Sequence, residues 1–351
     1  MYHRIIQEDM AYICKTSSIP WEKLRNANIL ITGGTGLIGS TLIRGLIYAN
    51  NERKLGLKIK AVVRSLDRVR EVFEESEINN DCISFICKNL DVPFEIEDDI
   101  DYIIHGASPT ASAYFTSNPV ETIKAGIIGT MNLLELAVKK KVEGFLFLSS
   151  MEIYGKVDTE NVLTEEKLGY INPLIIRSCY PETKRMSESI TAAYAHEYDV
   201  KAMSIRLAQT FGPGVLYDDK RVFAMMARCA MNGENIQLLT KGNSKHPYLY
   251  TAQAVTAILT VLLNGKAGES YNAANPNTYC SIADMGKLVA EKLSDGKIEV
   301  VFAMDGDTSK FPDTSFLNLS IDAITSLGWK AEGDLEYIFR RMIEVMKSER
   351  K

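Results

Sequence analysis

A tyrosine and a lysine four residues apart, Tyr180 and Lys184, form one combination that could do chemistry. On a helix such residues share a face, so the lysine ammonium would lie beside the phenol. A neighbouring cation favours the phenolate, so we expect the Tyr180 pKa to fall from its usual value of about 10. Tyr180 would then be a general base for the hydroxyl of a sugar or another alcohol. Because about one such pair is expected by chance among the 16 tyrosines, its position in the fold must support this interpretation.

Two serines and a glutamate form a second combination, in the segment Ser149-Ser150-Met151-Glu152. This segment continues the apolar run 145–148, which we expect to form a strand. Open parallel sheets bind ligands at the carboxyl ends of their strands. The Ser150 hydroxyl could there hydrogen-bond both a reacting oxygen and the Tyr180 phenol. In the alternative interpretation, the serines only cap the end of the strand.

A third segment, Gly33-Gly34-Thr35-Gly36-Leu37-Ile38-Gly39, has glycines at GxxGxxG spacing between an apolar run and a helical pattern. Gly33 permits a tight turn, Gly36 lets the backbone approach a pyrophosphate, and Gly39 allows close packing of helix on strand. Free N–H groups and the dipole at the start of the helix favour phosphate. The segment therefore predicts a dinucleotide-binding site.

The end of the second apolar run, at 59–63, should lie beside the adenosine ribose. An Asp or Glu there would bind the ribose hydroxyls of NAD, but Arg64 follows instead. Arg64 could stack on the adenine, bind the 2′-phosphate of NADP or face solvent. We therefore predict NAD as the cofactor, with NADP as the alternative. The residues expected to contact the cofactor are Gly33, Thr35, Gly36, Leu37, Ile38, Gly39, Arg64, Asn89, Leu90, Ala107, Ser108, Tyr180 and Lys184.

Short apolar runs alternate with helical patterns along the first 210 residues, and these elements must position the three combinations. The runs expected to be strands are 28–32, 59–63, 83–86, 102–105, 145–150 and 203–207, and the helices are 37–48, 67–77, 119–141 and 181–198. Apolar strands separated by helices predict a parallel sheet covered on both faces. Right-handed crossovers then give a doubly wound α/β fold.

Three parts of the chain are expected. Residues 1–26 form an N-terminal helical extension, which would cover an edge of the main domain or, alternatively, bind a partner. Residues 27–210, with about 245–280, form the dinucleotide-binding domain. Residues 211–244 and 281–351 form a smaller lobe interleaved with that domain.

The composition excludes several classes of protein. With 46% hydrophobic and 24% charged residues, the 351-residue chain can bury a large core and is not mainly disordered. A net charge of -5 argues against a nucleic-acid partner. Apolar windows are too short for a membrane span, and the N-terminal residues do not resemble a signal peptide. Six scattered cysteines without a CxxC motif indicate reduced thiols, so we expect a cytoplasmic protein. Four histidines without a metal-binding spacing predict no metal.

The GxxGxxG turn, the serine at a strand end and the downstream Tyr-x-x-x-Lys together resemble the extended short-chain dehydrogenase/reductase family. More narrowly, they resemble its NAD-dependent nucleotide-sugar epimerase/dehydratase branch, over about residues 28 to 345. Further matching segments are His105–Ser108, Gly129–Leu134, Phe211–Pro213 and Leu327–Trp329. The resemblance implies a Rossmann-like sheet, a nucleotide-sugar-binding role for the smaller lobe, and a homodimer formed through the two longest sheet-domain helices.

The resemblance also implies roles for individual residues. Ser150 would be the catalytic hydroxyl, Tyr180 the base, and Lys184 its electrostatic and ribose partner. In the family, the tyrosine takes the proton of the sugar C4 hydroxyl while hydride leaves C4 for the nicotinamide. The 4-keto sugar then follows one of three routes: hydride return to the other face, loss of water, or loss of CO2 from a uronic acid.

The chain departs from the family's patterns at several positions. Dehydratases carry Asp-Glu after the catalytic hydroxyl, whereas Met151-Glu152 stands here, leaving Glu152 as a candidate base at C5. Decarboxylases share a Ser-Glu version of this stretch and a segment like Cys179–Arg185, but they use an arginine where this chain has His246. Neighbouring Lys245 could replace that arginine. Gly126 and Gln209 stand where the family has asparagines.

We therefore expect first a nucleotide-sugar epimerase acting through a 4-keto intermediate, because it needs only Ser150, Tyr180 and Lys184. A 4,6-dehydratase or a UDP-glucuronate-type decarboxylase using Glu152 is the alternative, ahead of a net NADP reductase or a non-catalytic cofactor sensor. Arg221 could bind the substrate diphosphate or form a surface salt bridge. The residues expected to contact a nucleotide-diphosphate sugar are Ser150, Met151, Gln209, Arg221 and His246.

Overall fold

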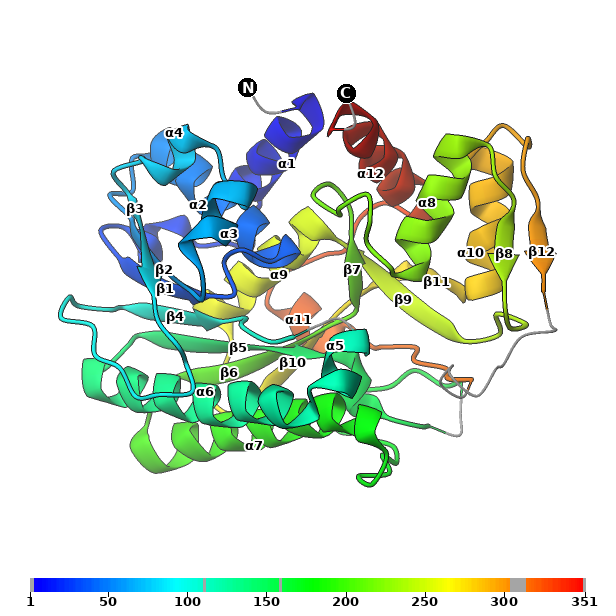
Figure 1. Ribbon diagram of the computed structural model, residues 1–351. Helices are drawn as coiled ribbons and strands as arrows, with labels where there is room; N and C mark the ends of the chain where they lie inside the picture. Colours follow the sequence, from blue (N-terminus) through cyan, green and yellow to red (C-terminus); the bar gives the residue numbers. More distant parts are fainter. Residues whose placement is uncertain (1–2, 110–111, 158–159, 304–313, 350–351) are drawn as a thin grey trace.

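The computed structural model describes residues 3–109, 112–157, 160–303 and 314–349. Within these residues, seven parallel strands form a central sheet in the order β10-β6-β5-β4-β1-β2-β3 (Figure 1). The strands are β1 (Asn28–Thr32), β2 (Lys58–Val63), β3 (Ile83–Cys87), β4 (Tyr102–His105), β5 (Gly144–Ser150), β6 (Ala202–Leu207) and β10 (Ser270–Ala273). Strand order reverses between β1 and β4, which is where such sheets bind ligands. The prediction of a Rossmann-like doubly wound sheet is confirmed.

Helices cover both faces of this sheet, because its strands are apolar on both sides. Helices α2 (Leu37–Arg53) and α9 (Thr251–Asn264) lie on one face, and α6 (Pro119–Lys140) and α7 (Cys179–Tyr198) on the other (Figure 1). Side chains alternate accordingly: Ile29 belongs to the core beneath α2, whereas neighbouring Leu30 belongs to the core beneath α6. No helix within the described residues is long and apolar enough to cross a membrane.

The helix expected over 67–77 is interrupted. Two short helices, α3 (Leu66–Val72) and α4 (Glu75–Ile78), stand there instead. Phe73 between them has extended backbone (φ -114°, ψ 142°) and is buried, with its ring centre 5.2 Å from that of Phe85. Burying the Phe73 ring against the sheet therefore outweighs continuation of the helix.

The N-terminal segment forms α1 (Arg4–Lys15) and a single 3-10 turn, η1 (Trp21–Leu24). Helix α1 packs against α2 and α9, so it covers helices of one face and not an edge of the sheet. Its buried Asp9 accepts hydrogen bonds from the Tyr250 hydroxyl (2.7 Å) and from Arg341 Nη2 (2.8 Å). Arg341 belongs to α12 (Leu335–Glu349), so this ion pair ties α1 to the last helix.

The smaller lobe lies beside the carboxyl ends of the main sheet (Figure 1). Its three-stranded sheet has the order β11-β9-β7, and two further strands, β8 and β12, pair in parallel. The elements are β7 (Gln209–Phe211), α8 (Val222–Asn232), β8 (Ile236–Leu238), β9 (Lys245–Tyr250), β11 (Asn275–Ser281), α10 (Ile282–Leu288), η4 (Val289–Leu293) and β12 (Val300–Phe302). Helix α11 (Asp322–Ser326) packs against β10 of the main sheet. Between β9 and β11, the chain returns to the main layer as α9 and β10.

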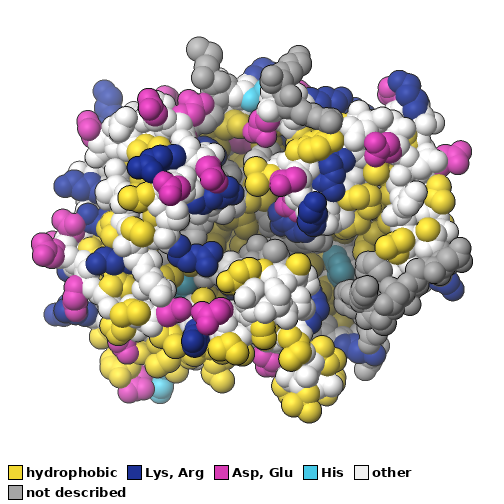
Figure 2. Space-filling model, viewed as in Figure 1, with side chains coloured by type: hydrophobic (Ala, Val, Ile, Leu, Met, Phe, Trp, Pro, Cys, Tyr) yellow, Lys and Arg dark blue, Asp and Glu magenta, His cyan; other side chains and the backbone are white. Residues whose placement is uncertain are grey.

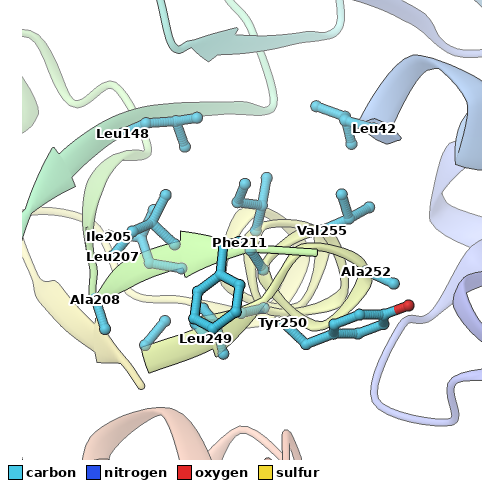
Figure 3. Close-up of a cluster of buried hydrophobic side chains, with 14 of the residues drawn as sticks. Leu42, Leu148, Ile205, Leu207, Ala208, Phe211, Leu249, Tyr250, Ala252 and Val255 are labelled. Carbon is cyan, nitrogen blue, oxygen red and sulfur yellow. The ribbon is translucent and has the colours of Figure 1, made fainter. Parts of the chain in front are cut away.

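The joint between lobe and main sheet is a dry aromatic and aliphatic core centred on Phe211 (Figure 3). The Phe211 ring stacks on Phe223 at 4.5 Å between centroids and contacts Tyr248 edge-on at 5.7 Å. Leu148 of β5 and Leu207 of β6 belong to the same buried cluster (Figure 3). Close packing of this kind resists shear, so residues on either side of the joint keep fixed positions relative to one another.

Candidate active site

A cleft of about 1520 Å³ runs from the turn after β1, past the ends of β4 and β5, to the smaller lobe. Figure 2 shows this face of the molecule hollowed near its middle. The cleft exceeds the space that one drug-sized ligand needs, so a dinucleotide and a nucleotide sugar could fit together. Every residue predicted to contact cofactor or substrate lines it; whether each contacts a ligand stays a prediction.

The glycine turn satisfies the geometric demands of a pyrophosphate cradle. Gly33 has φ +76°, and a Cβ there would lie 2.6 Å from the Gly106 backbone. A Cβ on Gly39 would lie 2.1 Å from the Gly33 carbonyl oxygen. At Gly36, the N-cap of α2, a Cβ would meet only that same oxygen, at 3.4 Å. Packing therefore requires glycine at positions 33 and 39, whereas at 36 the bare backbone borders the cleft. These residues fit a bound dinucleotide.

A buried histidine fixes the opposite wall of the cofactor end. His105 Nδ1 lies 2.8 Å from Thr32 Oγ1, and its Nε2 lies 3.1 Å from Thr130 Oγ1. Burial lowers the His105 pKa to about 3, with a smaller contribution from the charge of Lys184. The ring is therefore neutral at pH 7 and bridges β1, β4 and α6. Thr32 Oγ1 also accepts from the Ala107 N–H (3.1 Å), which positions the loop 106–108.

Basic residues gather at the adenosine end, which is the part of the cleft where the cofactor's adenosine is predicted to lie. Val63 and Cys87 are partners in the β2–β3 ladder, and the Lys88 N–H donates to the Val63 carbonyl (3.1 Å). Arg64 and Lys88 therefore leave the sheet side by side, and both line the cleft. Arg68 of α3 lines it too and pairs with Glu71 (2.6 Å). The sequence reasoning singled out Arg64 but missed Lys88 and Arg68, which only the strand register brings to it.

Ser150 and Tyr180 meet where β5 ends and α7 begins. Helix α7 starts at Cys179, which places the buried Tyr180 in its first turn, hydrogen-bonded to Ser150. Burial raises the Tyr180 pKa above its usual range, and the Glu152 charge raises it further. The Ser150 hydrogen bond and Arg177 oppose this rise. The predicted lowering of the Tyr180 pKa by Lys184 is therefore wrong for this structure.

Lys184 lies on the same face of α7, but its ammonium is directed elsewhere. Its Nζ donates to the Leu148 carbonyl (2.7 Å) and lies 4.6 Å from the centre of the Phe147 ring, against 5.9 Å for the Tyr180 ring. Burial lowers the Lys184 pKa to about 7, although Glu188, one turn further along, opposes the shift. The ammonium is thus held at the strand end, within the cleft wall.

A glutamate–arginine pair stands beside Ser150 and Tyr180. Arg177 Nη1 and Nη2 donate to the two carboxylate oxygens of Glu152, at 2.9 and 3.1 Å. Arg177 also lies 5.5 Å from the Phe115 ring centre, and that buried ring stacks on Tyr180 at 4.9 Å. Arg177 comes from η3 (Ile176–Ser178) and Phe115 from α5 (Ser112–Ser117). Both were missed: the position of Arg177 three residues before Tyr180 could have indicated it, but no sequence signal marks Phe115.

The substrate residues nearer the smaller lobe are differently engaged. His246 Nε2 lies 2.7 Å from Ser315 Oγ, and burial lowers the His246 pKa to about 4, so the ring is neutral at pH 7. Lys245 pairs with Glu160 (2.9 Å) and is not among the described residues that line the cleft. The suggestion that Lys245 replaces the decarboxylase arginine therefore gains no support from this structure and stays a prediction. Arg221 lines the cleft and pairs with Asp219 (2.6 Å), so the expected salt bridge forms, while its contact with a substrate diphosphate stays a prediction.

Gly126, the other departure from the family's pattern, lies outside the cleft. A Cβ there would come within 2.0 Å of Thr183 Cγ2. The glycine therefore allows α6 and α7 to pack closely, and its carbonyl accepts from Ser187 Oγ (3.2 Å). Gln209, by contrast, lines the cleft at the start of β7, as does Met151 after β5.

Comparison with known proteins agrees with this geometry. The sequence model described as the NAD dependent epimerase/dehydratase family matches residues 29–274. UDP-glucuronic acid decarboxylase 1 of Xenopus tropicalis is 30% identical over 324 residues, 92% of this chain and 72% of that protein. UDP-glucuronic acid decarboxylase 6 of Arabidopsis thaliana is 29% identical over 307 residues, 87% of this chain and 84% of that protein.

Two solved structures share the fold at lower identity. UDP-glucose 4-epimerase from Thermotoga maritima, with UDP-glucose, has a TM-score of 0.73 at 22% identity, covering 92% of this chain and 100% of that one. dTDP-glucose 4,6-dehydratase from Bacillus anthracis, in complex with NAD, has a TM-score of 0.71 at 20% identity, covering 92% and 97%. With the glycine cradle, the strand-end serine and the Tyr-x-x-x-Lys helix on one cleft, the chain belongs to the NAD-dependent epimerase/dehydratase family of nucleotide-sugar enzymes.

Proposed function

We propose that the protein oxidises C4 of a nucleotide-linked uronic acid and removes its carboxyl group as CO2. The observation that carries this proposal is the Glu152 carboxylate, held by Arg177 beside Ser150 and Tyr180. Curated relatives spanning most of the chain are UDP-glucuronic acid decarboxylases, which supports the same choice. Epimerisation, expected first from Ser150, Tyr180 and Lys184 alone, becomes the second candidate. The neutral His246 at the decarboxylase arginine position is the observation in its favour.

The residues divide the chemistry between them. Bound NAD would accept hydride from C4 and, in a redox-neutral cycle, return it. Tyr180 would take the proton of the C4 hydroxyl as a phenolate, which the Ser150 hydrogen bond and the charge of Arg177 favour against the pKa rise caused by burial. Ser150 would hydrogen-bond the same C4 oxygen. When the C5–carboxyl bond breaks, its electron pair moves toward the C4 carbonyl, and Ser150 and Tyr180 would stabilise the charge developing on that oxygen. The enolate left by loss of CO2 must then gain one proton at C5, and the Glu152 carboxylate would relay that proton from water.

Incubating the NAD-loaded protein with UDP-glucuronate and UDP-glucose tests this function. We expect CO2 release and a sugar product about 44 mass units lighter from the uronate, by the mass of the leaving group. A change of sugar configuration at constant mass would instead identify an epimerase. Loss of 18 mass units would identify a dehydratase, by the mass of water.

We propose further that the adenosine end accepts the 2′-phosphate of NADP as well as NAD. Arg64 stands where an NAD-selective site of this fold carries an acidic residue, and Lys88 and Arg68 line the same cleft. Fluorescence titration with NADH and NADPH measures the preference. Arg64→Ala should weaken NADPH binding about tenfold, as expected for one lost charge-assisted hydrogen bond, and NADH binding far less. Arg70→Ala, which removes an exposed pair with Asp67 outside the cleft, is the control.

A homodimer through α6 and α7 is also proposed. Helix α6 exposes Val120, Ile123 and Met131, and α7 exposes Met186, so the two helices present apolar side chains to solvent. Burying such residues against a second copy would be favourable. Light scattering after gel filtration should give twice the chain mass, and Met131→Lys should lower it toward the monomer. A monomeric mass for the unaltered protein would contradict the proposal.

A further inference from the structure

A uronic acid substrate brings a second carboxylate to a site that already holds one. Glu152 lies beside the catalytic Ser150 and Tyr180, so a sugar carboxylate on C5 would approach another negative charge. Two carboxylates at such short range repel unless a cation stands between them. The decarboxylation proposed above therefore needs a cation at this end of the cleft.

Most cations near the cleft are placed or engaged elsewhere. Lys156, which also lines the cleft, is exposed and already has an interaction partner. His246 is neutral and bonded to Ser315, and Lys245 is paired with Glu160 away from the cleft. Lys184 is held by the Leu148 carbonyl beneath Tyr180. Arg64, Lys88 and Arg68 stand at the adenosine end. Arg221 lies on the lobe side, where its guanidinium is paired with Asp219.

Arg177 meets the need in both position and geometry. It lines the cleft, and its side chain is 35% exposed. Two of its N–H groups, one on each terminal nitrogen, bind Glu152 end-on. These two N–H groups are the first fork of the guanidinium. A guanidinium has five N–H donors, so the Nε–H and one further terminal N–H point the same way along its side and form a second fork. Among the residues that the structure describes, that second fork has no hydrogen-bond acceptor. The Phe115 ring lies under the Arg177 guanidinium and also stacks on Tyr180, so the position of Arg177 is linked through Phe115 to that of the base.

We propose that Arg177 is a specificity-determining residue that binds the carboxylate of a uronic acid sugar through this second fork, while its first fork holds Glu152. The inference rests on the proposed decarboxylation. One planar cation would then neutralise two carboxylates, that of Glu152 and that of the substrate. A neutral hexose, with a hydroxymethyl group in place of the carboxylate, would not require Arg177.

Calorimetric titration of the NAD-loaded protein with UDP-glucuronate and UDP-glucose tests the assignment. Arg177→Met keeps the length of the side chain and removes its charge. Losing charge-assisted hydrogen bonds should weaken UDP-glucuronate binding about tenfold to a hundredfold and change UDP-glucose binding less than about twofold. Glu152→Gln should change the affinity in the opposite direction. It should tighten UDP-glucuronate binding several-fold, because it removes the competing negative charge, and it should slow CO2 release.

Arg70→Met removes an exposed arginine–carboxylate pair outside the cleft and is the matched control. Circular dichroism and NAD affinity establish that each variant is folded. Equal weakening of both nucleotides by Arg177→Met, or weakening of neither, would overturn the assignment. If the unaltered protein binds UDP-glucuronate through Arg177 but releases no CO2, decarboxylation is wrong and the carboxylate site stands. If CO2 is released and Arg177→Met keeps full affinity, the function stands and the site is wrong.

Discussion

The two ends of the cleft are built in different ways. At the cofactor end, backbone sets the shape: Gly33 and Gly39 are confined by carbonyl groups, and Thr32 and His105 fix the facing loop. At the sugar end, side chains from distant segments set the shape, as when Arg177 holds Glu152 and Phe115 stacks on Tyr180. Where backbone forms the wall, an added side-chain atom disrupts the packing. Where side chains form the wall, single substitutions can change the contacts with the ligand without loss of the fold.

The largest expected effect is at the sugar end. Tyr180→Phe removes the hydroxyl that would take the C4 proton, so turnover should fall at least about a hundredfold. Cofactor affinity and melting temperature should change little, since the ring still stacks on Phe115. Tyr198→Phe, at the exposed end of the same helix, is the control. Unchanged turnover in Tyr180→Phe would refute the assigned base.

Substitutions that add a side chain to the glycines of the cofactor end should lower the stability of the fold. A Cβ at position 39 would lie 2.1 Å from the Gly33 carbonyl oxygen, so Gly39→Ala should lower the free energy of unfolding by about 1–3 kcal/mol or more. Gly36→Ala meets nothing closer than 3.4 Å and should leave stability nearly unchanged while weakening NAD binding. Urea unfolding and cofactor titration separate the two effects. Equal stability losses would show that position 36 also serves packing.

This difference also explains how much the sequence could predict. The strands, the glycine turn and the positions of Ser150, Tyr180 and Lys184 follow from local patterns, which parallel-sheet topology converts into a common edge. Phe115 and Arg177 reach the site through tertiary packing, for which short-range spacing gives no rule. The Tyr180 pKa was misjudged for the same reason. Helical spacing places Lys184 on the correct face, but it reveals neither the burial of the phenol nor the Leu148 carbonyl that holds the ammonium.

Lowering the pH should destabilise the fold at both ends of the cleft, because each end contains one buried, neutral histidine. Burial lowers the pKa of His105 to about 3 and that of His246 to about 4, below the usual 6.5. The unfolded chain therefore binds more protons than the folded one below pH 6.5. Each histidine's contribution to stability is complete above that pH and falls by about 1.4 kcal/mol per pH unit as the pH decreases toward the folded pKa.

Chemical unfolding between pH 7 and 4.5 measures this slope. His105→Asn, at the cofactor end, and His246→Gln, at the sugar end, should each reduce the slope by the contribution of about one bound proton. A slope that neither substitution alters would mean that other groups govern the acid sensitivity.

The smallest expected effect is an improvement in the KM for UDP-glucuronate. His246→Arg adds a cation where the family's decarboxylases carry one, so the KM for UDP-glucuronate should fall by about tenfold or less, the value of one added charge-assisted contact. The KM for UDP-glucose should stay the same. A matching change for both nucleotides would show that position 246 senses the nucleotide and not the sugar.

The close contact between α6 and α7 has a consequence for how this sequence can change over time. Because a Cβ at Gly126 would come within 2.0 Å of Thr183 Cγ2, a larger residue at 126 requires the Thr183 side chain to move or to become smaller. Restoring the family's asparagine at 126 should be harmful in the present background and tolerated beside Thr183→Gly. A larger residue at 126 can therefore persist only if position 183, on the helix that carries Tyr180 and Lys184, has become smaller first.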